Sequence, residues 1–214
     1  MRILNDRLRL LPRSFSAGLR SLRAGALCAA MAVAPAVAQA PAPAPAPSGE
    51  TAPAAPAPAA GEQRIEEIAS RPAILFEGES AWEDGYSTLT GAFQKLKAEL
   101  ERAQLVGAGA PVAVFVATDD LGFRYQAMAP LSQAPGEAVR LSSGFKVGQT
   151  PAGRAVKFEH RGSYEEIDAT YEAITAWLDE KNLDARDFFV EEFANPGRGP
   201  DDGDTAVDVY VFVK

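Results

Sequence analysis

Two stretches of the chain repeat apolar residues at the three-to-four spacing of an amphipathic helix. The first stretch begins at about Glu83. Its apolar positions are Tyr86, Leu89, Phe93, Leu96 and Leu100. The second stretch has apolar positions at Ile167, Tyr171, Ile174 and Leu178. Charged residues lie between these positions, so each stretch is predicted to form a helix with one face against a core.

Extended segments flank both predicted helices. In the first part of the chain they are residues 72–77, the continuous apolar run 112–117 and residues 123–131, with a turn at 119–122. In the second part they are residues 154–159, residues 188–193 and the alternating valines at 207, 209, 211 and 213, with a loop at 195–203. The alternation of the valines predicts a half-buried strand.

The same order of elements occurs twice, at a shift of 82 positions. Residues 73–77 resemble residues 155–159, and Phe76 matches Phe158 (158 − 76 = 82). At the same shift Trp82 meets Tyr164, and Leu96 meets Leu178. We therefore predict an α+β domain at residues 64–214, with strand-helix-strand-strand repeats at about 64–131 and 149–214. The repeats should pair about a pseudo-twofold axis as one antiparallel sheet, with the helices on one side.

The first 40 residues have the three parts of a secretory signal. Residues 2–23 are basic, residues 24–37 are apolar and rich in alanine, and Ala38 and Ala40 are small residues that suit a signal peptidase. We expect cleavage after Ala40 and a periplasmic or secreted protein without stable membrane insertion. An uncleaved anchor is the alternative, but it needs roughly twenty apolar residues. Cys28, the only cysteine, lies in the apolar stretch, so the mature protein is expected to have no thiol.

Residues 41–63 are predicted to be a linker. Alanine and proline dominate this segment, and bulky apolar side chains are rare in it. Alternating prolines favour a polyproline II spacer, whereas a disordered leader that aids export is the alternative.

Charge is distributed unevenly along the chain. Residues 1–40 hold six arginines and one acid, which leaves 15 of the 21 basic and 28 of the 29 acidic side chains to residues 41–214, a net charge of −13. Such a surface repels phosphate backbones, so nucleic acid is not expected as a partner. It suits neutral or cationic partners.

An ordered set of segments resembles a known family. The segments are residues 150–156 (TPAGRAV), 158–164 (FEHRGSY), 176–178 (AWL), 191–193 (EEF) with Pro196, and 205–211 (TAVDVYV). They are similar to the GyrI-like small-molecule-binding family, the effector-binding domain of AraC- and MerR-type multidrug regulators. The resemblance covers most of residues 64–214. It implies two strand-helix-strand-strand modules with a ligand cleft between them and a glutamate in the pocket.

Two departures from the family pattern affect the expected function. Phe193 stands where the family often has a tyrosine, which removes one hydrogen-bonding group from the pocket. A signal and a linker also stand where the regulators carry a helix-turn-helix segment. A transcriptional role is therefore not expected.

Glu191 is the residue most expected to bind a ligand. The period of two in a strand places it on one face with Phe189 and Phe193, so its carboxylate should lie among aromatic rings. Burial would raise its pKa, and a cationic ligand would restore the charged form. In the alternative, Glu191 faces solvent and Glu192 faces inward, or both are surface charges.

Three aromatic residues are expected to join Glu191 in the ligand-binding site. They are Trp82 and Tyr164, which match in the repeat just before each helix, and Phe193. Tyr171 and Trp177 lie at helical core spacing and are expected to pack.

The remaining candidates do not indicate a catalytic, metal or cofactor site. His160 is the only histidine, and we expect a solvent-contacting loop residue more than a haem ligand. Residues 201–204 (DDGD) lack the spaced ligands of a helix-loop-helix calcium site and predict a solvated turn.

Three functional hypotheses remain open from the sequence. The first is a periplasmic module that binds an amphipathic, cationic small molecule between its two halves. The second is a hydrolase of reactive small molecules that uses the pocket glutamate as a general base. The third is an envelope interaction protein whose cleft is occluded by its own side chains.

Overall fold

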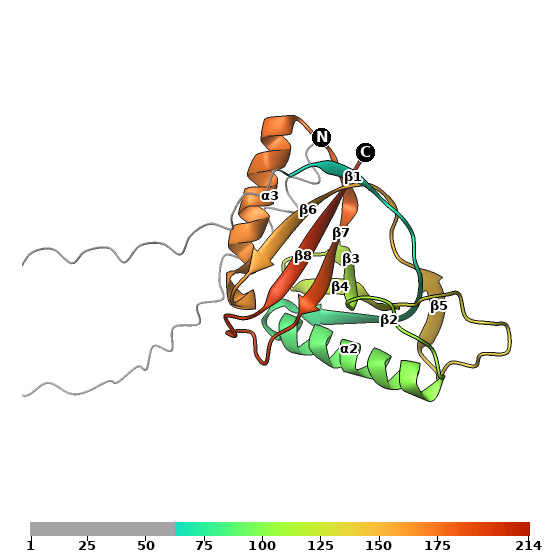
Figure 1. Cartoon of the computed structure of the whole chain (residues 1–214). Coiled ribbons are helices and arrows are strands. Elements are labelled where there is room, and N and C mark those ends of the chain that lie inside the picture. Colours follow the sequence, from blue (N-terminus) through green and yellow to red (C-terminus); the bar gives the residue numbers. More distant parts are fainter. Residues whose placement is uncertain (1–62) are drawn as a thin grey trace, which may run out of the picture. The chain divides into compact units, whose positions relative to one another are not determined.

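Two long helices interrupt a succession of strands in the computed structural model, which describes residues 63–214 (Figure 1). In chain order the elements are β1 (Ile65–Ile68), β2 (Pro72–Ala81), the 3-10 turn η1 (Trp82–Asp84), α2 (Gly85–Arg102), β3 (Val112–Thr118), β4 (Gly122–Pro130), β5 (Phe145–Gln149), β6 (Gly153–Arg161), the 3-10 turn η2 (Tyr164–Glu166), α3 (Ile167–Lys181), β7 (Ala185–Asn195) and β8 (Ala206–Val213). The secretory signal, Cys28 and the linker up to residue 62 lie outside the described residues. Neither helix of residues 63–214 combines the length and apolarity that crossing a bilayer requires.

The eight strands of this region form one antiparallel sheet. Their order is β1-β6-β8-β7-β3-β4-β2-β5, so β7 and β3 meet at the centre. The buried side chains of α2 and α3 belong to a single apolar cluster with side chains of the central strands, which places both helices on one face. This confirms the predicted α+β fold with its helices packed on one side of an antiparallel sheet.

The structure preserves the 82-residue shift between the two halves. Phe76 of β2 pairs with Ala127 of β4, and Phe158 of β6 pairs with Val209 of β8, each residue lying 82 positions after its counterpart. The two 3-10 turns and the first residues of the two helices are related by the same shift. The repeat seen in the sequence is therefore a repeat of three-dimensional structure.

The pseudo-twofold axis can be located from the strand register. Phe115 of β3 pairs with position 125, and Phe193 of β7 pairs with position 207, again 82 residues further on. Phe115 and Phe193 are thus counterparts, and two positions earlier Ala113 and Glu191 are counterparts as well. Ala113 and Glu191 are also direct partners in the sheet. The axis therefore passes through this pair, and Glu191 lies at the seam between the halves.

Two edge strands exchange places between the halves. β1 precedes β2 in the chain but pairs with β6, and β5 precedes β6 but pairs with β2. Their connections run side by side, because the Arg71 backbone N–H donates to Thr150 Oγ1 at 3.0 Å and the Thr150 N–H donates to the Arg71 carbonyl at 2.9 Å. These exchanged connections link the two halves.

β8 is buried on both faces, which differs from the predicted half-buried strand. The four valines face the helices and are buried, as their alternation predicts. On the opposite face Phe212 is also buried, in a second apolar cluster with Val190 and Val112. Asp208 on that face is covered by Lys157 and Arg161, whose amino and guanidinium groups lie 2.7 and 2.8 Å from its carboxylate. Long basic side chains and a second cluster thus cover the face expected to be in water.

Candidate functional site

Glu191 projects from β7 into the helix-covered side of the sheet. Its side chain is 1% exposed, and Phe193, two positions on, is buried in the cluster on that side. Glu192 points to the opposite face, where its carboxylate lies 3.1 Å from the Arg71 guanidinium. The strand alternation therefore separates a buried carboxylate on the helix side from an ion-paired one on the other side.

Two tyrosine hydroxyls satisfy the Glu191 carboxylate. Tyr164, in η2, donates to Oε2 at 2.8 Å, and Tyr171, in α3, donates to Oε1 at 2.6 Å. Within residues 63–214 no lysine, arginine or histidine pairs with this carboxylate. Burial raises the pKa of Glu191 to about 7, although the two hydrogen bonds act in the opposite direction. The group is therefore poised between its neutral and charged forms near neutral pH.

Aromatic rings cover the hydrogen-bonded group. The Tyr164 ring centroid lies 5.7 Å from that of Phe193 and 5.5 Å from that of Tyr86 in α2. The ring centroid of Phe93, about two helical turns after Tyr86 in α2, lies 5.0 Å from that of Phe193. These rings fill the space between the two helices at the seam, so the carboxylate is sealed from solvent in this structure.

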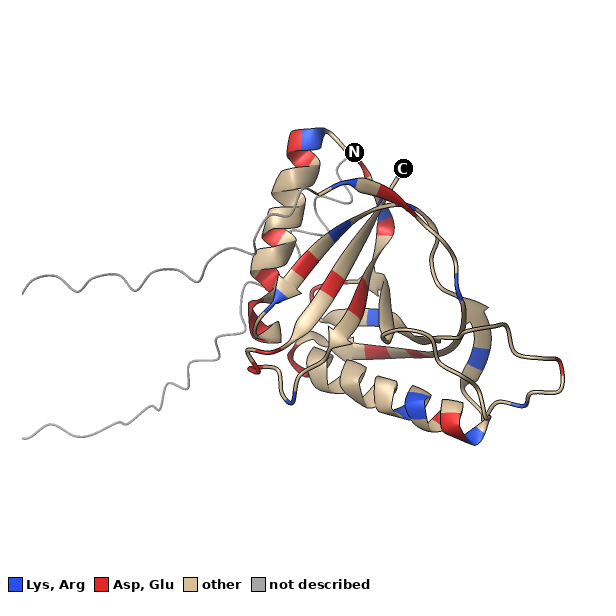
Figure 2. Ribbon diagram, in the orientation of Figure 1, with Lys and Arg blue, Asp and Glu red and all other residues tan. Residues whose placement is uncertain are grey.

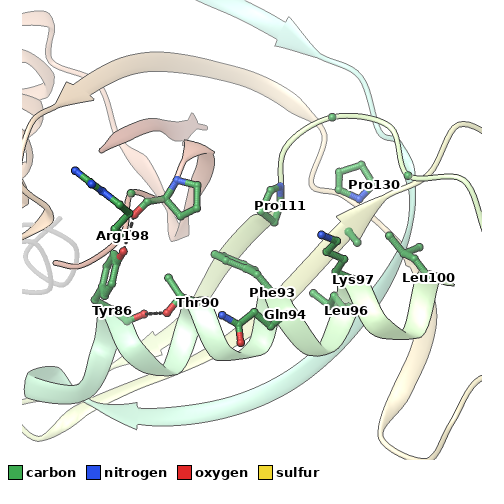
Figure 3. Close-up of a pocket in the computed structure, with 15 residues that line it drawn as sticks. Tyr86, Thr90, Phe93, Gln94, Leu96, Lys97, Leu100, Pro111, Pro130 and Arg198 are labelled. Carbon is green, nitrogen blue, oxygen red and sulfur yellow. Dashed lines mark hydrogen bonds between the residues drawn. The ribbon is translucent and has the colours of Figure 1, made fainter. Parts of the chain in front are cut away.

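A pocket of about 440 Å³ opens beside this aromatic layer (Figure 3). One wall is the face of α2 that carries Tyr86, Phe93 and Leu100. Other walls come from Pro111, at the start of β3, and from the end of β4 and the segment after β7. Tyr86 and Phe93 belong both to the pocket wall and to the ring layer over Glu191. The Tyr86 and Phe93 rings therefore lie between the pocket and the Tyr164 and Phe193 rings that cover the carboxylate.

The loop after β7 closes the pocket at the Tyr86 end. The Tyr86 hydroxyl donates to the Pro196 carbonyl at 2.6 Å. The Pro200 carbonyl accepts from the Ser163 hydroxyl at 2.9 Å, just before Tyr164. One loop thus ties the first turn of α2 to the turn that carries Tyr164.

The acidic residues of this loop stabilise its turn. Asp202 accepts hydrogen bonds from the backbone N–H groups of Asp204 and Arg198, and these bonds with the Arg198 side chain hold the pKa of Asp202 at about 2. Residues 63–214 contain no cluster of side chains arranged to hold a metal ion. Residues 201, 203 and 204 are exposed, so this segment is the predicted solvated turn.

Acidic residues occur in η2 and in the loop after β7, two segments that lie next to each other near the start of α2 (Figure 2). Burial and the charges of Asp202 and Asp201 raise the pKa of Tyr86. Burial, the nearby Glu191 and, more weakly, Asp168 raise the pKa of Tyr164 well above its ordinary value. Negative charges therefore act on both tyrosine hydroxyls at this end of the pocket, and the Arg198 side chain that lines it is paired with Asp202.

Three of the four predicted site residues come together, and Trp82 lies elsewhere. Its ring packs against Phe123 at 5.0 Å, and its Nε1–H donates to the Asp119 carbonyl at 2.9 Å. Trp82 and Tyr164 are true counterparts in the repeat, yet only Tyr164 contacts the residue on the axis. The repeat conserves backbone positions, whereas the side-chain length and hydrogen-bonding groups differ between the halves.

Tyr171 contributes more than the packing expected of it. Its ring is buried against Phe189 at 5.1 Å, and its hydroxyl binds Glu191. A tyrosine at a core position needs a hydrogen-bond partner for its hydroxyl, which is the signal that could have identified it. Trp177 packs edge-on against Phe158 at 5.8 Å, in keeping with the expected core role.

His160 is buried, contrary to the expected solvent-contacting loop residue. It is 4% exposed at the end of β6, where Nδ1 lies 2.9 Å from Thr170 Oγ1 and Nε2 lies 2.9 Å from the Ser163 carbonyl oxygen. Burial lowers its pKa. The ring ties β6 to η2 and α3, and so supports the turn that carries Tyr164.

The pocket wall formed by α2 was not predicted as a site. The sequence pattern there is an amphipathic helix, whose apolar positions such as Tyr86, Phe93 and Leu100 are ordinarily expected to pack in the core. The wall becomes concave only because the segments before β3 and after β7 lie across from it. Sequence spacing along one helix carries no information about those distant segments.

Comparison with known proteins identifies the class of domain. The model of the GyrI-like small molecule binding domain matches residues 62–214. The chain belongs to the GyrI-like family, and binding of a small molecule is the function that this class of domain defines. The predicted resemblance is confirmed. No curated protein sequence matches the chain.

Solved structures share the fold at low sequence identity. The C-terminal domain of EcmrR superposes with a TM-score of 0.60 at 13% identity, covering 72% of this chain and 97% of that domain. In the EcmrR–DNA complex the match has a TM-score of 0.60 at 12% identity, and the 72% of this chain that aligns spans only 57% of EcmrR. A hydrolase from Listeria innocua gives a TM-score of 0.53 at 13% identity, covering 71% of this chain and 91% of the hydrolase. These likenesses show the fold.

Proposed function

We propose that the ligand of this domain is an amphipathic cation whose positive group pairs with Glu191. The observation that carries the proposal is a fully buried carboxylate that meets two tyrosine hydroxyls and no positive charge. A buried carboxyl group is costly to ionise without a counter-charge, and a bound cation supplies one. Aromatic faces beside it add cation-π attraction.

Binding at Glu191 requires the covering side chains to move. The ligand enters the pocket at the Tyr86 end, where the negative charges of Asp201 and Asp202 act on the tyrosine hydroxyl. Tyr86 and Tyr164 then turn aside, and the Tyr164 hydroxyl releases Oε2 of the carboxylate. Phe93 and the apolar wall of α2 remain to hold the rest of the ligand.

A calorimetric titration with tetraphenylphosphonium, a lipophilic cation, tests this proposal. Wild-type protein should bind it, and Glu191→Gln should weaken binding by about tenfold or more, because the counter-charge is lost. Glu192→Gln is the matched control, since this neighbouring carboxylate is on the other face and paired with Arg71. Equal affinity in all three proteins would contradict the role of Glu191. Calorimetry is preferable to tryptophan fluorescence because neither Trp82 nor Trp177 lines the pocket.

Hydrolysis with Glu191 as general base is the second candidate. A pKa of about 7 suits proton transfer at neutral pH. Both carboxylate oxygens are bonded to tyrosines, however, so water could be activated only after the same displacement. Turnover of reactive esters by the wild type that disappears in Glu191→Gln would favour this activity, and binding without turnover would favour the binding module.

The occluded interaction protein fits the structure less well. Tyr164 and Phe193 do fill the space over Glu191, as that hypothesis requires. Trp82 does not join them, and a pocket of about 440 Å³ lies next to them. The domain therefore has space for a ligand next to these rings.

We also propose that the domain acts after export. The support is the basic, apolar and small-residue order of residues 1–40. Sequencing the N-terminus of the mature protein tests it, and the expected first residue is Pro41. A mature protein that retains residues 1–40 would contradict the proposed processing.

A further inference from the structure

The two charged residues that line the pocket beside α2 differ in their partners: Arg198 at the Tyr86 end is paired with Asp202, and Lys97 at the other end is not ion-paired among residues 63–214. At the Tyr86 end the acidic groups of Asp201 and Asp202 act on the tyrosine hydroxyl. Arg198 also lines that end, but its guanidinium is bonded to Asp202 at 3.0 Å, which leaves Asp201 uncompensated by it. At the other end the lining contains Lys97.

Lys97 is the basic residue of α2 whose amino group has no charged or aromatic partner among residues 63–214. Lys95 lies over the Phe76 ring at 5.1 Å, and Arg102 is paired with Glu99 at 2.6 Å. No carboxylate among residues 63–214 lies within ion-pairing distance of the Lys97 amino group. Figure 3 shows its side chain rising from α2 below Pro130, with the amino group turned towards Pro111 and away from Leu100.

The wall between the two ends is mainly apolar. Phe93, Leu96, Pro111 and Pro130 line it, and Thr90 and Gln94 are its polar members. Tyr86 and Lys97 are eleven residues apart in the helix, which corresponds to about 16 Å along its axis at roughly 1.5 Å per residue. An α-amino acid is too short to reach both ends. A molecule that contacts both needs an apolar body between its charged groups.

We propose that the pocket selects a zwitterionic amphiphile, with a cationic group at the Tyr86 end, an anionic group at Lys97 and an apolar chain or ring system between them. This inference rests on the proposed function, because it adds an anion site to the same pocket. The cationic group uses Glu191 after the tyrosines move. The anionic group uses the Lys97 ammonium, and the apolar body uses the wall formed by α2, Pro111 and Pro130.

Three straight-chain probes of equal length separate the two charges. They are 12-aminododecanoic acid, dodecylamine and dodecanoic acid, titrated calorimetrically at neutral pH into the wild type, Lys97→Met and Lys95→Met. Lys97 is exposed to solvent, which weakens its ion pair, so the pair should favour the amino acid over the amine by only about three- to fivefold in the wild type. Lys97→Met should remove this preference, and Lys95→Met, two residues away and outside the pocket, should keep it.

The outcomes distinguish failure of the anion site at Lys97 from failure of the proposed cation binding. Equal affinity of the amine and the amino acid in the wild type, with both bound, would overturn the anion site and leave the proposed function intact. A preference that survives in Lys97→Met would also overturn it. Failure of both amines to bind would contradict the proposed function itself. Tightest binding by dodecanoic acid would contradict the cationic end of the pocket.

Discussion

At the scale of single residues, the chain keeps a carboxylate buried without a positive partner. Between pH 4.5 and about 7 the folded protein holds the Glu191 proton that the unfolded chain releases. The native state therefore binds more protons in this interval, and the free energy of unfolding falls as pH rises through it. The carboxylate reduces stability at neutral pH, which is typical of a group kept for binding.

A pH series of urea unfolding measures this contribution. Relative to Glu191→Gln, the wild type should lose up to about 3 kcal/mol of unfolding free energy between pH 4.5 and 8. Glu192→Gln should follow the wild-type pH dependence. If the wild type and Glu191→Gln follow parallel curves, the carboxylate does not have a raised pKa.

The tyrosine hydroxyls set how far that pKa rises. Each donates to the carboxylate and so favours its charged form. Tyr164→Phe should therefore raise the pKa of Glu191 above about 7, observable by NMR titration of labelled glutamate side chains. Tyr86→Phe is the control, because its hydroxyl bonds Pro196 and not the carboxylate. An unchanged or lowered pKa in Tyr164→Phe would contradict the assignment of this hydrogen bond.

At the scale of elements, α2 carries both the pocket wall and an attachment for the β4–β5 connection. Glu99 is 4% exposed and accepts from the Ser142 backbone N–H at 2.7 Å and from the Arg102 guanidinium. The Arg102 hydrogen bonds, opposed by burial and assisted by Ser142, hold the pKa of Glu99 at about 2. This cluster fixes the end of α2 that lies beyond Lys97.

Removing this attachment should cost stability in a pH-dependent way. Glu99→Gln should lower the unfolding free energy by roughly 1–3 kcal/mol at neutral pH, because the Ser142 N–H and the Arg102 guanidinium lose a charged acceptor. The folded pKa is lowered, so the wild-type advantage exists above pH 4.5 and disappears as pH falls towards about 2. Glu101→Gln, on the exposed side of the same helix, should have little effect. A Glu99→Gln deficit that is constant with pH would contradict an ionised Glu99.

The sequence predicts some elements well because their periodicity is local. Both helices, the strands around them and the repeat follow from apolar spacing and from the 82-residue match. β1 and β5 were not predicted, since IEEI and FKVGQ become strands by pairing with β6 and β2 across the domain. The alternation around Glu191 placed the carboxylate on one face with Phe189 and Phe193 but left open which face is buried, and its tyrosine partners depend on how α3 packs. The pocket depends on segments remote from α2 in the chain.

At the scale of the whole molecule, the site lies between two halves of the same fold, and differences between their side chains make it asymmetric. The pseudo-twofold axis passes between Ala113 and Glu191, so one half supplies a small side chain where the other supplies a carboxylate. Tyr164 and Trp82 differ in the same way. Two halves with the same backbone arrangement thus form one asymmetric site, and its charged group lies at the seam between them.

The most direct test of this account is the proton released when a cation binds. Near pH 7 Glu191 is about half protonated, so pairing with tetraphenylphosphonium should release about half a proton per cation. Calorimetric titrations in buffers of different ionisation enthalpy measure this number. The account predicts proton release in the wild type and none in Glu191→Gln. Cation binding without proton release in the wild type, or with equal release in both proteins, would contradict it.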